Sequence, residues 1–218
     1  MAAAPHGRGA ASRWVRRTAA GAVLVGLLAG AAREPAPAAA PGNGHAGAPS
    51  SWWHGLGLRD LNGAPLDPPA RWFVVVFLGQ ECPVSNLSIP VLNRLADEFS
   101  PRGFAFVGAY VDPNAGLGEL RSHAAEYAVR FPAADDREHR LVRVAGATYT
   151  PEVAVFSAAG VKLYDGRIDD RVGSLGAARP AATRQELREV LIALAAGSAG
   201  PFPGKPGYGC AIPEGVRP

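Results

Sequence analysis

The sequence predicts an α/β domain built around a central mixed sheet. An apolar run, 72–78, precedes residues 83–100, in which apolar side chains recur at helical spacing. Residues 104–110 form a second continuous apolar run, as expected of a strand that is buried on both faces. Further along, two short apolar runs are separated by the turn Ala159-Gly160, which predicts a hairpin, and a last helix follows it.

The remaining elements follow from spacing and from helix start and stop signals. Pro83 suits the first helical turn, whereas Pro90 is predicted to kink the same helix. The other predicted helices are 117–129, 137–144 and 183–196, and the hairpin strands are 153–156 and 161–164. Thr183 is the predicted N-cap of the last helix, Glu186 its capping partner and Gly197 its stop. The order βαβα(α)ββα combines a right-handed parallel βαβ unit with a C-terminal ββα unit.

Residues 1–40 are predicted to be a signal peptide. Arg13, Arg16 and Arg17 form a basic region, an uncharged apolar stretch follows at 18–32, and 38–40 offer a small-residue cleavage site. The apolar stretch is shorter than the roughly 20 residues that span a bilayer. A twin-arginine signal and an uncleaved membrane anchor are the alternatives. Each of them places the rest of the chain in the periplasm or elsewhere outside the cytoplasm.

The rest of the chain is predicted to hold one domain. Residues 41–55 are expected to be a linker, 56–197 the folded domain, and 198–218 a Gly/Pro-rich tail that carries Cys210. Trp52 and Trp53 are expected to pack on the domain. The formal net charge is +3, to which the arginines of the signal contribute. The sequence has no zinc-finger spacing and no phosphate-cradling glycine loop, so we expect no nucleic-acid partner. Membrane contact is expected only through an uncleaved N-terminal segment.

Cys82 and Cys210 are the two cysteines of the chain. Cys82 follows a predicted strand and opens a predicted helix, where backbone N–H groups and the helix dipole favour a thiolate. The amides of Val84 and Ser85 are the expected donors. Two cysteines in an exported chain often pair, so a lasting or transient Cys82–Cys210 disulfide and two free thiols both remain open. Gly209 lets the backbone beside Cys210 approach the domain closely.

The element order resembles the thioredoxin superfamily over residues 56–197, with Cys82 after the first strand and Thr150-Pro151 before the third. The resemblance implies a thioredoxin-like three-layer fold and a cis Pro151 that faces Cys82. The residues that it implies around the substrate groove are Pro83, Val84, Ser85 and Thr150.

Three segments together, 77–86, 164–171 and 209–212, resemble exported bacterial redoxin-domain proteins of the alkyl hydroperoxide reductase and thiol-specific antioxidant class. The chain departs from two better-known mechanisms. Ser85 stands where a Cys-x-x-Cys motif has its second cysteine, and a hydroxyl cannot form a disulfide, so Cys210 is the candidate resolving thiol. Gly79 stands where thiol peroxidases of the peroxiredoxin type carry a peroxide-binding threonine. Antioxidant activity is therefore implied by the resemblance alone.

These features predict an exported thiol-disulfide oxidoreductase, or redoxin, with Cys82 as the nucleophile, Cys210 as a resolving thiol and Pro151 shaping the substrate groove. Its expected partners are protein or small-molecule thiols and disulfides, with no cofactor and no metal. The main alternative is a non-catalytic binding or assembly module with a structural disulfide, in which the charges of residues 165–171 make contacts. Those charges could instead line a groove or bond to one another across a loop.

Two further alternatives are a thiol peroxidase and a copper-handling protein. The second would use both cysteines and a histidine, because such soft ligands suit copper. The candidate histidines are His54, His123 and His139. His123 is expected on a helix surface, and His139 in a solvated charged stretch.

Overall fold

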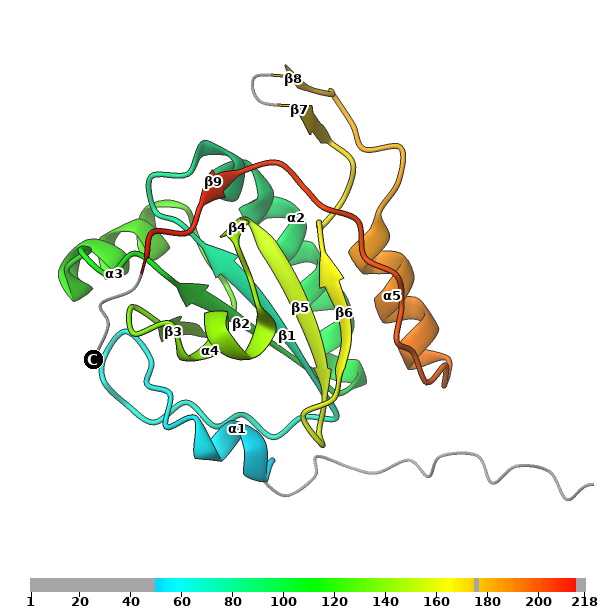
Figure 1. Ribbon diagram of the computed structural model, residues 1–218, viewed down its shortest axis with the longest axis horizontal. Coiled ribbons are helices and arrows are strands. Elements are labelled where there is room, and N and C mark those ends of the chain that lie inside the picture. The colour runs from blue at the N-terminus through cyan, green and yellow to red at the C-terminus, as the bar shows by residue number, and fades with distance from the viewer. Residues whose placement is uncertain (1–49, 175–176, 215–218) are drawn as a thin grey trace, which may run out of the picture. The chain divides into compact units, whose positions relative to one another are not determined.

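The computed structural model describes residues 50–174 and 177–214. A five-stranded sheet in the order β3-β2-β1-β5-β6 lies at the centre of this part of the chain (Figure 1). Strands β1 (Trp72–Leu78), β2 (Phe104–Tyr110) and β3 (Ala133–Asp135) are parallel, whereas β5 (Glu152–Ser157) runs antiparallel to β1 and to β6 (Lys162–Gly166). The predicted mixed sheet, with its parallel βαβ unit and its C-terminal ββα unit, is confirmed.

Helices cover both faces of the sheet. One face packs against α2 (Pro83–Phe99), α3 (Leu117–Glu126) and α5 (Glu186–Ala195), and the other packs against α1 (Ser51–Gly55) and α4 (Arg140–Ala145). Alternate residues of β1 enter the two cores, with Val74 and Val76 on the first face and Phe73 and Val75 on the second. All seven residues of β1 are buried, which explains why its sequence is one continuous apolar run. The short elements are η1 (Ser100–Arg102), β4 (Tyr149–Thr150), β7 (Val172–Ser174), β8 (Ala177–Ala178) and β9 (Cys210–Ala211).

The packed part of the chain begins earlier than the sequence predicts. Within the expected linker 41–55, residues 51–55 form α1, and Trp53 is fully buried. Its ring stacks on Phe73 with centroids 4.5 Å apart, and its Nε1 donates a hydrogen bond to the carbonyl of Leu66 at 2.8 Å. The expected packing of Trp52 and Trp53 on the domain is confirmed. Burial of these aromatic rings anchors residues 51–55 to the core, although the sequence predicts a linker there.

Two helices begin later than predicted, and in both cases a buried carboxylate accepts backbone amides near the predicted start. The last helix begins at Glu186 with Gln185 as its N-cap, so the prediction that Thr183 caps it is wrong. The amide and hydroxyl of Thr183 instead donate to the carboxylate of Asp170. Similarly, α4 begins at Arg140 rather than at residue 137, since Asp136 accepts the amides of two residues in its first turn. Helix α3 ends at Glu126 instead of reaching residue 129.

The C-terminal tail lies along the domain over residues 198–214 (red in Figure 1). The amide of Phe202 donates to the carbonyl of Leu163 at 2.7 Å, and the carbonyl of Lys205 accepts the amide of Arg167 at 2.9 Å. Its strand β9 then pairs antiparallel with β4, which places Cys210 opposite Thr150. The tail therefore reaches back to the cysteine-bearing end of the sheet.

The predicted signal peptide, residues 1–40, lies outside the described residues. In residues 50–174 and 177–214, none of the helices has the length and apolar character needed to cross a membrane.

We expect replacement of Asp136 by alanine to lower the free energy of unfolding by about 2 kcal/mol. Asp136 is 1% exposed, and its two carboxylate oxygens accept the amides of Leu141 at 2.9 Å and Val142 at 3.0 Å. Truncation leaves both amides without that acceptor. Urea unfolding followed by far-UV circular dichroism measures the change.

Asp97→Ala is the matched control, because that carboxylate forms an exposed ion pair with Arg130. Its expected cost is below about 0.5 kcal/mol. Equal costs for the two variants would contradict the capping role of Asp136.

Candidate functional site

Cys82 lies between β1 and α2 and is the N-cap residue of α2. Its amide donates to the carbonyl of Gly79 at 3.1 Å, and its carbonyl accepts the amide of Asn86 at 3.1 Å. Pro83 follows in the first turn of α2. The side chain of Cys82 is buried, with 2% of its surface exposed. The loop and the helix start therefore fix the sulfur at the end of the sheet.

Cys82 and Cys210 come together beside Thr150. The peptide between Thr150 and Pro151 is cis, as predicted. The thiol of Cys82 donates to the carbonyl of Thr150 at 3.0 Å, and Thr150 pairs with Cys210 across the β4–β9 ladder. Both cysteines are free thiols in this structure, Cys82 buried and Cys210 exposed.

The close approach of the tail depends on Gly209. A Cβ atom at this position would collide with the carbonyl oxygen of Thr150. The predicted need for a glycine beside Cys210 thus has a steric cause.

The two thiols have opposite pKa shifts. Burial raises the pKa of Cys82, but hydrogen bonds from the Cys210 thiol, from Thr150 and from the amide and hydroxyl of Ser85 outweigh it and lower the pKa to about 7. Although the residue as a whole is exposed, partial desolvation of its sulfur, the hydrogen bond to Cys82 and the charge of Cys82 raise the pKa of Cys210 to about 11. Of the two amides expected to stabilise the thiolate, that of Ser85 is the one that lowers this pKa. At neutral pH about half of Cys82 is therefore thiolate, whereas Cys210 stays protonated.

Gly79 has no room for a side chain. A Cβ atom there would lie 2.9 Å from Oγ1 of Thr150 and 3.2 Å from Cβ of Cys82. A peroxide-binding threonine at this position would have to displace Thr150. The geometry agrees with the sequence departure that argues against the peroxiredoxin mechanism.

His123 is buried, so the expectation that it lies on a helix surface is wrong. Its Nε2 faces Oδ1 of Asn86 at 2.9 Å, and its Nδ1 faces the hydroxyl of Tyr110 at 2.8 Å. Asn86 donates its Nδ2 to the carbonyl of Gln80 at 3.1 Å, so its Oδ1 accepts a proton from Nε2 of His123. Burial lowers the pKa of His123. A neutral histidine thus braces the loop that leads to Cys82, and the sequence hint was its position three residues after the buried Leu120.

The other candidate histidines have separate partners. His54 pairs with Asp67 at 2.9 Å, and Nε2 of the buried His139 contacts the carbonyl of Val111 at 2.6 Å. The expectation that His139 lies in a solvated stretch is therefore wrong. Residues 50–174 and 177–214 contain no group of three His, Cys, Asp or Glu side chains that could hold a metal ion.

The charges of residues 165–171 bond mainly within the domain. Arg167 forms an ion pair with the buried Glu186, and Asp170 accepts hydrogen bonds from Arg179 and Thr183. Asp169 accepts the amide of Arg171 at 2.9 Å. Most of this cluster therefore holds the loop between β6 and α5 in place.

A narrow groove runs beside Pro151. The first turns of α2, the loop after β6 and the tail form its walls, and its lining residues are Val84, Ser88, Pro151, Arg167, Ile168, Asp169, Val172, Gly207 and Tyr208. The implied groove residues Pro151 and Val84 belong to this lining, whereas Pro83, Ser85 and Thr150 lie outside it. Ser85 and Thr150 contact Cys82 instead.

Residues 58–163 match the sequence model of the AhpC/TSA family. A search of curated proteins gave no match. Among solved structures, a hypothetical protein from Sinorhizobium meliloti 1021 is 22% identical with a TM-score of 0.61, over 73% of this chain and 91% of that one. An uncharacterized conserved protein from Geobacillus kaustophilus is 23% identical with a TM-score of 0.62, over 74% and 89%.

A candidate thiol:disulfide interchange protein, DsbE, from Chlorobium tepidum is 18% identical with a TM-score of 0.51, over 63% of this chain and 91% of that one. At these identities the structures establish the fold. With the mixed five-stranded sheet, they show that the fold is thioredoxin-like, and within that fold residues 58–163 are similar to the AhpC/TSA family.

Proposed function

We propose that the protein is a thiol-disulfide oxidoreductase in which Cys82 is the nucleophile and Cys210 is the resolving thiol. One observation carries the proposal: Thr150 joins the two thiols, because its carbonyl accepts the buried Cys82 thiol at 3.0 Å and β9 places Cys210 opposite it. The pKa of Cys82 is lowered to about 7 and that of Cys210 is raised to about 11. A thiolate next to a protonated partner is the starting state that exchange requires.

The cycle has two exchange steps. The Cys82 thiolate attacks one sulfur of a substrate disulfide, forms a mixed disulfide and releases the other substrate sulfur as a thiolate, which takes up a proton. Cys210 then loses its proton, attacks Sγ of Cys82 and releases the second substrate thiol. The substrate disulfide gains two electrons and the protein ends with a Cys82–Cys210 disulfide, which an external thiol reductant returns to two thiols.

The surroundings of Cys82 support these roles. As a thiol, Cys82 donates to the Thr150 carbonyl, and as a thiolate it accepts from Thr150, Ser85 and Cys210. Pro151 offers no N–H and borders the groove through which a substrate chain would approach. Pro83 starts α2 directly after the nucleophile, and Val84 presents an apolar surface in the groove.

The family context and the N-terminal sequence agree with this proposal. The Chlorobium tepidum neighbour is named for thiol:disulfide interchange. The predicted signal peptide at residues 1–40 would place the reaction outside the cytoplasm, where protein disulfides persist and supply substrates. Partners would be proteins or small molecules that carry disulfides or thiols.

We expect Cys82→Ser to abolish reduction of a small aromatic disulfide, because the hydroxyl cannot form the mixed disulfide. Cys210→Ala should still complete the first step and then accumulate a mixed disulfide on Cys82. Intact-protein mass spectrometry under non-reducing conditions detects that adduct. Unchanged exchange in Cys82→Ser, or no adduct in Cys210→Ala, would instead favour a non-catalytic binding module.

We expect the alkylation rate of Cys82 to rise with pH around a midpoint of about 7, and that of Cys210 around about 11. Each thiol reacts as its thiolate, so each rate follows deprotonation. Ser85→Ala should raise the midpoint for Cys82, since it removes a hydroxyl that donates to the thiolate. Peptide mapping after timed iodoacetamide labelling separates the two sites.

Ser122→Ala is the control for that measurement. Its hydroxyl bonds to a carbonyl four residues earlier in α3, so its loss should leave the Cys82 midpoint unchanged. A midpoint near the free value of about 8.5 in the unmodified protein would be incompatible with the proposed thiolate site.

A further inference from the structure

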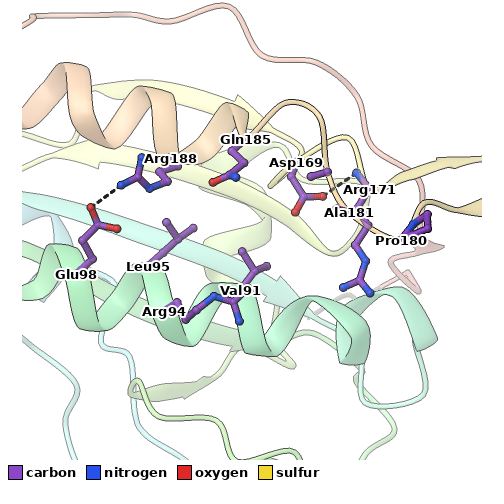
Figure 2. A pocket seen from close by; sticks show the side chains of 11 residues that line it. Val91, Arg94, Leu95, Glu98, Asp169, Arg171, Pro180, Ala181, Gln185 and Arg188 are labelled. Atoms are coloured by element: carbon purple, nitrogen blue, oxygen red, sulfur yellow. Dashed lines mark hydrogen bonds and ion pairs between the residues drawn. The ribbon is translucent and has the colours of Figure 1, made fainter.

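A second cavity, of about 390 Å³, lies between α2 and α5 (Figure 2). Its floor on α2 is apolar, with Val91 and Leu95, and its rim carries the guanidinium groups of Arg94, Arg171 and Arg188. Arg171 reaches toward α2 from the loop after β6, as Figure 2 shows. The cavity thus combines an apolar floor with cations supplied by separate elements.

The cations of this cavity exceed its anions. Three arginines and two acids, Glu98 and Asp169, line it, which leaves one excess positive charge. Arg188 pairs with Glu98 at 2.8 Å. Within the part of the chain that the structure describes, neither Arg94 nor Arg171 has an ion-pair partner, and Asp169 accepts the backbone amide of Arg171. Nε of Arg171 donates to the carbonyl of Arg179 at 3.4 Å, so the terminal nitrogens of Arg171 and the guanidinium of Arg94 are the groups that face an incoming anion.

The cavity neighbours the groove beside Pro151. Asp169 lines both. On α2, Val84 and Ser88 line the groove, and Val91 and Leu95 line the cavity, a spacing that keeps all four on one helix face. Val84 and Val91 are seven positions apart, which is about 10 Å along the helix. An extended peptide covers the same distance in about three residues.

We propose that this cavity binds the carboxylate of an acidic residue in the substrate, about three or four residues from the cysteine that reacts with Cys82. The inference rests on the proposed function and adds a substrate preference to it. Arg94 and Arg171 bind the carboxylate through charge-assisted hydrogen bonds, while Val91 and Leu95 contact the aliphatic stem of the acidic side chain.

The test compares two synthetic peptides that differ in charge. Each carries one cysteine as a mixed disulfide with thionitrobenzoate, and either Glu or Gln at the third and fourth positions on both sides of it. The Cys82 thiolate attacks the peptide sulfur, a Cys82–peptide disulfide forms, and thionitrobenzoate leaves with the electron pair of the old bond. Its absorbance gives the second-order rate constant.

The Glu peptide should react about fivefold faster than the Gln peptide, and added salt should reduce the difference. R94Q/R171Q should remove the preference. The matched control R130Q/R143Q also loses two positive charges, but both of its arginines lie outside the cavity, so it should retain the preference. Equal rates for the two peptides in the unmodified protein, or a preference that survives in R94Q/R171Q, would overturn the inference.

Cysteine amide with the same leaving group, which carries no peptide, separates this inference from the proposed function. Its reaction reports on Cys82 alone and should be equal in the unmodified protein and in R94Q/R171Q. If it reacts at Cys82 and the two peptides do not differ, exchange chemistry stands and the acidic-residue site is refuted. If it does not react at Cys82, the proposed function fails, and the inference fails with it.

Discussion

The pairing of β9 with β4 is the contact on which the approach of the two thiols depends. It is only two residues long, yet it places Cys210 opposite Thr150, whose carbonyl accepts the thiol of Cys82. Without this ladder, Cys82 would lose the hydrogen bond from Cys210 that helps to lower its pKa. The tail contacts at Leu163 and Arg167 guide the chain to this point along β6 and the loop after it.

The sequence predicted four of the five strands of the central sheet, because buried strands are continuously apolar, but it did not predict the three-residue strand β3. Strands β1 and β2 match their predicted ranges, since both are covered on two faces and every position in β1 had to be apolar. Helix starts were less predictable. Thr183 had the right chemistry for an N-cap, but Asp170, a residue of the preceding loop, bound its hydroxyl and moved the helix start to Glu186.

Part of the candidate site could also be predicted from the local sequence. Cys82 and Pro151 stand at element boundaries, which local sequence reveals. The position of Cys210 depends on the path of a tail rich in glycine and proline, and its composition permits many paths. The burial of His123 was mispredicted because its spacing from Leu120 was a weak hint, and its two polar partners, Tyr110 and Asn86, are distant in sequence. The cavity between α2 and α5 joins residues far apart in sequence and has no sequence signature.

The same segment of tail performs two tasks, because Gly207 and Tyr208 form a wall of the groove and Cys210 follows two residues later. Because β9 begins at Cys210, the number of residues between the groove wall and β9 sets which residue lies opposite Thr150. An insertion of one residue there would move Cys210 out of register with Thr150 while keeping the sequence of every other part intact. The length of this connection, and not only its composition, is thus under constraint, although a loop of the same composition elsewhere on the surface would tolerate such a change.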